Sequence, residues 1–105
     1  MGDKLRGQLT ESMFYVLMAF LRRDMCGTDV AEFVERRTGG RLHMGPGTLY
    51  TLLAKFQEEG LLRETQVEGR KRTYHLTEKG RHAYQEELER LRRCLSDGEE
   101  EWNSL

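Results

Sequence analysis

Residues 45–60 read Gly45-Pro-Gly-Thr-Leu-Tyr-Thr-Leu-Leu-Ala-Lys-Phe-Gln-Glu-Glu-Gly60, a stretch that carries helix start, helix face and helix stop signals together. Pro46 suits the first turn, where a missing N–H costs nothing, and Gly60 suits the left-handed residue that closes a helix. The apolar residues recur at i, i+3, i+4 and i+7, which places them on one stripe facing a core. They are Leu49, Leu52, Leu53 and Phe56. The stretch therefore predicts an amphipathic helix.

The rest of this helix is polar and carries Thr48, Tyr50, Thr51 and Lys55, while the acidic residues are confined to its last turn. A helix N-terminus is positive by its dipole, and hydroxyl, phenol and amine donors beside it suit a phosphate backbone. An ordinary amphipathic helix with a solvated face explains this stretch equally well. The rest of the chain has to decide between the two interpretations.

Length and composition limit the classes of protein. The 105 residues, 33% charged and 37% hydrophobic, are typical of one small soluble domain, whose modest core makes help from a second copy plausible. No apolar run approaches the roughly 18 residues of a membrane span, and no secretory signal opens the chain. We therefore expect a cytoplasmic protein with no membrane partner. Cys26 and Cys94 form no motif, which predicts free buried thiols rather than a disulfide or a zinc site.

The net charge of −1 hides an uneven distribution. Between Gly69 and Arg81, five basic residues against one acidic residue give a local charge of +4. The last eleven residues carry four acidic side chains and no basic one, which gives −4. Because binding to nucleic acid depends on a local basic patch, the near-neutral total does not argue against it.

The first part of the chain predicts a loose polar arm over Met1 to Gln8, followed by a helix from Glu11 to Asp24 that Thr10 or Ser12 can cap. Apolar residues cover more than one face of this helix, which is too much for an element with a single buried side. We expect one face to meet the domain core and another to meet a second subunit. Met25, Cys26 and Gly27 are expected to break the helix.

A second helix is predicted from Thr28 or Asp29, either of which can be the N-cap, to Arg37. Its apolar residues form one narrow stripe: Val30, Phe33 and Val34. Thr38-Gly39-Gly40 ends it, and a short extended piece over Leu42 to Met44, which could be a tiny third strand, leads into Pro46. Two helices joined in this way predict a helix-turn-helix with a slightly long connection.

After Gly60 the period of the sequence changes from 3.6 to 2, which predicts strands over Leu61 to Val67 and Arg72 to Leu76. The residues between them form a hairpin connection with a glycine where positive φ is expected. A hairpin directly after a recognition helix is a wing. Its tip and second strand carry Arg70, Lys71 and Arg72, which can reach phosphates or a minor groove. The alternative is that these charges only solvate an edge hairpin.

A last helix is predicted from its cap, Thr77, to at least Leu95. Its apolar residues are spaced 4, 3 and 4, a heptad seam that needs a partner helix, and they are Tyr84, Leu88, Leu91 and Leu95. Favourable i,i+4 pairs flank the seam at Glu86/Arg90 and Glu89/Arg93. Ser96-Asp97-Gly98 is expected to fray or end the helix, although Trp102 would continue the same seam if it did not. The acidic run after Gly98 is expected to be a solvated tail, with Trp102 as an anchor or surface residue.

Catalysis finds little support in the sequence. His43, His75 and His82 are scattered without metal-ligand spacing, and neither cysteine lies in a nucleophile arrangement. No phosphate-binding glycine loop is present, because the glycines of residues 45–47 lack a preceding strand and a following Lys-Ser/Thr. We therefore predict no enzyme, no catalytic residue, no metal and no cofactor.

Two motifs together resemble a known family. PGTLYTLLAKFQEEGLL followed by GRKRTYHLTEKGR is similar to the PadR-type winged-helix transcriptional regulators, over roughly Glu11 to Leu95. The resemblance implies that Thr48, Tyr50 and Lys55 face DNA from the recognition helix, and that Arg70, Lys71 and Arg72 face it from the wing. Thr51 departs from the family, whose members often have proline after the tyrosine. The short C-terminal helix resembles the smaller subgroup with a single dimerisation helix.

The predicted fold is α+β and mainly α: a winged helix-turn-helix DNA-binding domain over residues 1–76 and a C-terminal dimerisation helix with an acidic tail over residues 77–105. The predicted function is sequence-specific binding of double-stranded DNA by a homodimeric repressor; a winged-helix protein-interaction module is the alternative. Candidate DNA-binding residues are Thr48, Tyr50, Thr51, Lys55, Arg70, Lys71 and Arg72. Candidate dimerisation residues are Phe14, Leu17, Met18, Tyr84, Leu88, Leu91 and Leu95.

A small-molecule effector at the dimer interface is the least supported partner. In multidrug-sensing members of the small PadR-like subgroup, a tryptophan partway along the C-terminal helix stacks on flat aromatic ligands. The corresponding position here is near Leu91, whereas the only tryptophan is Trp102. A pore lined by Phe14, Met18, Leu88 and Leu91 could admit an apolar ligand, but leucines on a heptad seam favour a closed interface.

Overall fold

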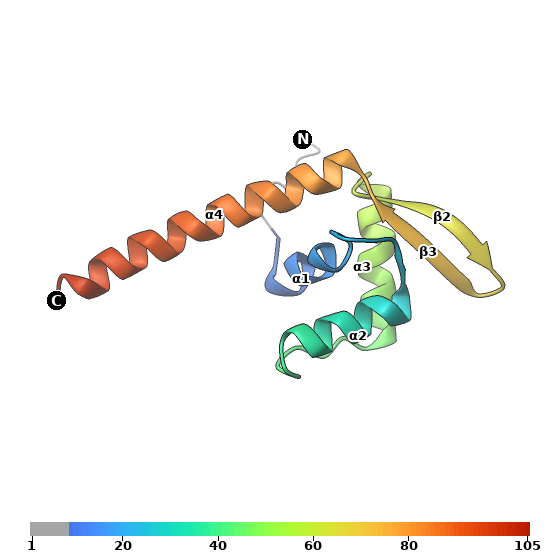
Figure 1. Ribbon diagram of the computed structural model, residues 1–105, viewed down its shortest axis with the longest axis horizontal. Coiled ribbons are helices and arrows are strands. Elements are labelled where there is room, and N and C mark those ends of the chain that lie inside the picture. Colours follow the sequence, from blue (N-terminus) through green and yellow to red (C-terminus); the bar gives the residue numbers. More distant parts are fainter. Residues whose placement is uncertain (1–8) are drawn as a thin grey trace.

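The computed structural model of the chain describes residues 9–105, and the predicted arm from Met1 to Gln8 lies outside them. Three short helices form the body, a β-hairpin projects on one side, and a long last helix projects on the other (Figure 1). The elements in chain order are α1 (Glu11–Ala19), β1 (Met25–Cys26), α2 (Gly27–Arg37), α3 (Pro46–Glu58), β2 (Leu62–Glu68), β3 (Lys71–Leu76) and α4 (Glu78–Asn103). This arrangement confirms the predicted mainly helical α+β fold with a winged helix-turn-helix.

The helix α3 forms as its sequence signals predict. Pro46 is its first residue, and Gly60 closes it with a φ of +82°, a conformation that glycine adopts without the steric cost of a Cβ. The apolar stripe faces the core: Leu53 and Phe56 are fully buried and Leu49 nearly so, while Leu52 is half-buried. These side chains pack with residues of α1, α2 and the sheet in one continuous core.

The sheet has three antiparallel strands in the order β1-β3-β2. Its third strand is β1, which pairs Met25 with Tyr74 and Cys26 with Thr73. The expected third strand at Leu42 to Met44 is therefore wrong. The expected break at Met25-Cys26-Gly27 does separate the first two helices, but its first two residues form a strand and Gly27 is the first residue of α2. A two-residue strand is too short to show any period in the sequence, so only its pairing with β3 reveals it.

The ends of the first two helices also differ from the prediction. The helix α1 starts behind its cap Thr10 but ends at Ala19, because the chain must turn before Met25 to reach β3. Arg22 and Arg23 consequently lie after the helix rather than in its last turn. The helix α2 begins at Gly27 behind Cys26, and Asp29 lies inside it, where its carboxylate accepts a hydrogen bond from the Cys26 amide at 3.3 Å.

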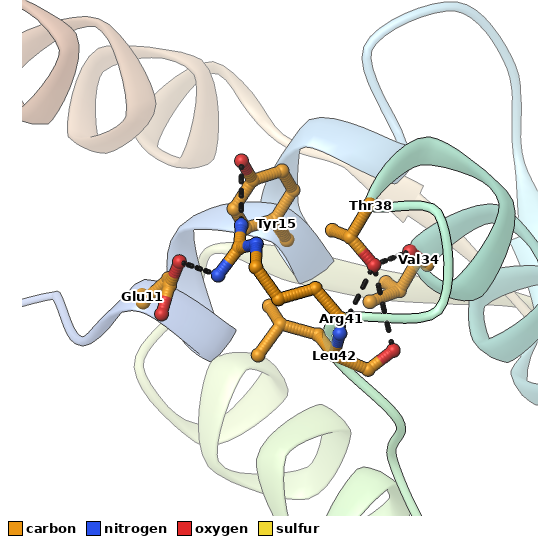
Figure 2. Close-up of polar contacts among 6 residues, drawn as sticks. All are labelled: Glu11, Tyr15, Val34, Thr38, Arg41 and Leu42. Atoms are coloured by element: carbon orange, nitrogen blue, oxygen red, sulfur yellow. Dashed lines mark hydrogen bonds and ion pairs between the residues drawn. The ribbon is translucent and has the colours of Figure 1, made fainter.

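Side-chain contacts of Thr38 and Arg41 fix the connection between α2 and α3 to α2 and to α1 (Figure 2). The Thr38 hydroxyl donates to the Val34 carbonyl at 2.8 Å and accepts from the Leu42 amide at 3.1 Å. Arg41 reaches across to α1, where it pairs with the Glu11 carboxylate at 2.5 Å and lies 5.9 Å from the centre of the Tyr15 ring. These contacts hold the helix-turn-helix in one arrangement although its connection is long.

The start of α4 is joined to the end of α3. The Thr77 hydroxyl accepts from the Gly80 amide at 3.0 Å, which caps α4, and donates to the Gly60 carbonyl at 2.6 Å. The Thr77 amide donates to the Leu61 carbonyl at 3.1 Å. Gly80 packs so closely on Leu61 that a Cβ built on it would lie 2.2 Å from the Leu61 carbonyl oxygen.

Only the first part of α4 packs on the body. The Tyr84 ring stacks on the Phe14 ring of α1 with their centres 4.7 Å apart, and burial raises the pKa of Tyr84. From Leu91 onward every residue is exposed, yet the helix continues through Gly98 to Asn103, so the predicted end near Ser96 is wrong. No helix within residues 9–105 is long and apolar enough to cross a membrane.

The ion pairs along α4 also differ from those predicted. The predicted i,i+4 pairs are replaced by i,i+3 pairs, because Arg90 binds Glu87 and Arg92 binds Glu89 at 3.0 Å. The Glu87 carboxylate is only 2% exposed. A buried charge of this kind requires a partner, and Arg90 supplies it.

Candidate nucleic-acid interface

The polar residues predicted on α3 are at its surface, but they lie on different sides of the helix. Thr51 occupies the middle of the exposed face, Thr48 and the half-buried Lys55 flank it on one side, and Tyr50 flanks it on the other. Thr48 and Thr51 are exposed, and Tyr50 is 50% exposed. The exposed face of α3 thus carries two threonines in its first half, with one aromatic side chain at its edge and with Gln57 and Glu58 near its C-terminal end.

Tyr50 lies against the first residue of α2. A Cβ built on Gly27 would approach the Tyr50 ring at 2.8 Å and its hydroxyl oxygen at 3.0 Å. Only glycine therefore leaves room for the Tyr50 ring in this position. No local signal in the sequence marks Gly27 as part of the site, because the contact joins residues of two different helices.

The wing carries its three predicted basic residues at the surface. Gly69 opens the turn between β2 and β3 with a φ of +63°, and Glu68 pairs with Lys71 across the hairpin. Arg70, Lys71 and Arg72 are all exposed. Arg72 forms an ion pair with Glu64 of β2 at 2.6 Å, so part of its charge is already compensated within the wing.

The N-terminus of α2 lies near both the wing and α3. Burial opposes ionisation of Asp29, but hydrogen bonds from the thiol and amide of Cys26, together with the charges of Arg23 and Lys71, hold the pKa of this carboxyl below its usual value. The pairing of Cys26 with Thr73 places the middle of β3 beside the start of α2, whereas Lys71 lies further along the hairpin, next to its turn. Tyr50 of α3 and the middle of β3 therefore lie beside the same helix terminus, which is a favourable place for anions.

The residues predicted for dimerisation differ in exposure. Leu17 is fully buried, and Phe14 is 9% exposed because it stacks on the half-buried Tyr84. Met18 and Leu88 are half-buried, while Leu91 and Leu95 are 37% and 62% exposed. A cavity of about 350 Å³ lies between α1 and α4, and Phe14 and Leu91, two of the four residues of the predicted ligand pore, line it.

The remaining candidate groups do not converge on one site. Cys26 is buried, but Cys94 is exposed, so the prediction of two buried thiols is wrong for Cys94. His75 pairs with Asp24 at 2.8 Å and His43 lies 3.7 Å from Glu35, on different parts of the body. Within residues 9–105 no three His, Cys, Asp or Glu side chains gather in a metal-binding arrangement.

Solved structures with the same fold include a transcriptional regulator from Clostridium thermocellum, 19% identical with a TM-score of 0.74, covering 84% of this chain and 89% of that one. A PadR family transcription regulator from Clostridium difficile is 15% identical with a TM-score of 0.72, covering 84% and 94%. Bacillus subtilis PadR in complex with operator DNA is 19% identical with a TM-score of 0.66, covering 75% of this chain and 47% of that one.

At these identities the solved structures establish a likeness of fold. No curated protein is significantly similar to the chain. The sequence profile of the transcriptional regulator PadR-like family matches residues 16–86, which include the helix-turn-helix, the wing and the first turns of α4. The chain belongs to this family of transcriptional regulators.

Proposed function

We propose that the protein is a sequence-specific DNA-binding repressor that acts as a homodimer. The observation that carries the proposal is the exposed basic tip of the wing, Arg70, Lys71 and Arg72, on the same domain as the exposed polar face of α3. The helix α3 presents small polar side chains that can enter a major groove, and the wing presents cations that can follow the adjacent backbone or minor groove. One of the similar solved structures, Bacillus subtilis PadR, is a complex with operator DNA.

The test is selection of genomic fragments by the purified protein, followed by anisotropy titration of the selected duplex at several salt concentrations. Neutralisation of phosphates makes affinity fall steeply with salt, whereas a protein-interaction module has no such dependence on duplex DNA. Repression then requires a reporter placed behind the selected promoter. Failure to enrich any fragment would contradict the proposal.

Gly27→Ala should weaken binding to the selected duplex by roughly tenfold, because the new methyl group displaces the Tyr50 ring. A tenfold loss of affinity corresponds to about 1.4 kcal/mol in binding free energy. Tyr50 is half-exposed and can swing outward, so the melting temperature should change little. In a Tyr50→Ala background the Gly27→Ala change should cost nothing, since the clashing ring is gone. An equal loss of affinity in both backgrounds would contradict the proposed positioning of Tyr50 by Gly27.

The homodimer should form through the exposed part of the heptad seam of α4 together with Met18 of α1. Met18, Leu88, Leu91 and Leu95 leave apolar surface that a second copy can cover, while Leu17 has no surface to contribute. An isologous pair of this kind would place two α3 helices about 34 Å apart, one turn of DNA.

Leu88→Glu combined with Leu91→Glu should convert the dimer to monomer or aggregate, because it places two carboxylates on the apolar seam. Sedimentation at micromolar concentration measures the outcome. Arg93→Glu is the matched control, since it changes the net charge by the same amount at an exposed position outside the seam. A wild-type protein that sediments as a monomer would sink the dimer proposal.

A further inference from the structure

The end of α4 is helical where its sequence gives little reason for a helix. Beyond Leu91 the helix leaves the body and runs for about 18 Å to Asn103, at 1.5 Å per residue (Figure 1). Every side chain of this segment is exposed, and Trp102 and Leu105 are exposed by 74% and 96%. We call residues 97–105 the acidic tail.

The acidic tail opposes helix formation in three ways. Gly98 and Asp97 have poor helix propensity. Carboxylates near a helix C-terminus interact unfavourably with the dipole, and the last turn contains no basic residue to offset them. Asp97 and Glu101 are a repulsive i,i+4 pair. No residue from 9 to 105 forms an ion pair with any of the four carboxylates Asp97, Glu99, Glu100 and Glu101. The helical tail therefore fits a bound state in which another surface supplies positive charge and covers its apolar side chains.

A pocket with the matching chemistry lies on the body. It has a volume of about 340 Å³ and is formed by the end of α1, the following turn, β1 and the second half of α2. Its apolar lining includes Met18, Leu21 and Phe33, which are half-buried. Four exposed arginines also line it: Arg22, Arg23, Arg36 and Arg37. We call this the arginine pocket.

In the described part of the chain the four arginines are not held in ion pairs, although the charge of Arg23 acts on the Asp29 carboxylate. None of them forms an ion pair with a residue between 9 and 105. Four guanidinium groups around an apolar floor suit an occupant that is both anionic and aromatic, because arginine pairs with carboxylates and stacks on aromatic faces. The acidic tail has this composition, with four carboxylates next to Trp102.

We propose that the acidic tail of a second copy docks in the arginine pocket. The tail of the same chain cannot reach it, because α4 is one continuous helix of about 39 Å that carries its end away from α1 and α2 (Figure 1). The docking rests on the proposed homodimer and extends it: the heptad seam holds the two copies together, and the tail adds a second, salt-dependent contact to each partner.

Trp102 is the only tryptophan, so its fluorescence reports the tail alone. In the wild-type dimer its emission should be blue-shifted and protected from acrylamide quenching, and both effects should fade with added salt. Arg36→Glu with Arg37→Glu should expose Trp102 and weaken the dimer. The loss of dimer affinity should be no more than roughly tenfold, because exposed ion pairs contribute little individually. Glu100→Arg with Glu101→Arg should do the same, and the four changes combined in one chain should restore protection.

The control is Arg63→Glu with Arg81→Glu, which makes the same change in charge at exposed residues outside the pocket and should leave Trp102 protected. A dimer by sedimentation whose Trp102 is as quenchable as free tryptophan would overturn the docking and leave the dimer standing. A wild-type protein that sediments as a monomer would overturn both the docking and the dimer. The DNA-binding proposal is tested separately, by the anisotropy titrations. If benzoate, a small aromatic anion, bound wild type but not the Arg36/Arg37 variant while Trp102 stayed exposed in the dimer, the pocket would belong to small anions and the proposal would be wrong.

Discussion

Replacing Arg70, Lys71 and Arg72 together by alanine should lower affinity for the selected duplex roughly a hundredfold near physiological salt and flatten its salt dependence. All three side chains are exposed on the wing, and a dimer would lose six phosphate contacts, which reduces the slope of log K against log salt by about 5. The loss should be similar on most sequences, because phosphate contacts carry no base information. Anisotropy titrations of wild type and variant at several salt concentrations measure both quantities.

The single variants should not be equal. Arg72→Ala should have the smallest effect, because the Arg72 guanidinium already pairs with Glu64 at 2.6 Å and must give up that contact to reach DNA. Arg92→Ala with Arg93→Ala is the control, since it removes two positive charges from the exposed surface of α4. If the triple variant bound as tightly as wild type throughout the salt series, the assignment of the wing to DNA would be wrong.

Gly80→Ala should lower the free energy of unfolding by about 1–3 kcal/mol, the usual cost of overpacking. At this size each kcal/mol corresponds to roughly 4–8 °C in melting temperature. The added Cβ would lie 2.2 Å from the Leu61 carbonyl oxygen and 2.6 Å from a methyl group of Leu76. Because the Leu61 oxygen is backbone, the start of α4 must move away from Leu61 and from Leu76 of β3 to relieve the clash.

Gly98→Ala is the matched change on the same helix. No atom lies within 4 Å of a Cβ built there, and alanine is favoured over glycine in a helix by up to about 1 kcal/mol. This variant should raise the melting temperature or leave it unchanged. Thermal unfolding of both variants by circular dichroism tests the pair, and equal effects at the two glycines would contradict the close packing of Gly80 on Leu61.

Those parts of the fold that depend on local chemistry were predictable. Pro46, Gly60 and the apolar stripe between them were enough to define α3, because start, face and stop are all properties of neighbouring residues. The wing followed from the change of period and from Gly69. The exposure of Arg70, Lys71 and Arg72 followed as well, since hairpin tips lie at the surface.

Features that depend on contacts between distant segments were not predictable. The strand β1 exists only through its pairing with β3, and the early end of α1 follows from that pairing. The fit of Gly27 under Tyr50 joins two helices whose relative position no local pattern encodes. The continuation of α4 through Gly98 contradicts the local propensity of its residues, so the sequence around it predicted an end there.

The contacts between the end of α3 and the start of α4 affect which spacing of operator half-sites the proposed dimer can bind. Thr77 binds the Gly60 carbonyl at 2.6 Å and Gly80 rests on Leu61, so two contacts tie the start of α4 to the end of α3 and should make the two helices move together. In the proposed dimer, the angle at which two copies of α4 cross then sets the distance between the reading helices directly. An insertion of half a helical turn between the operator half-sites could not be absorbed by the protein and should be rejected as firmly as a change of base sequence.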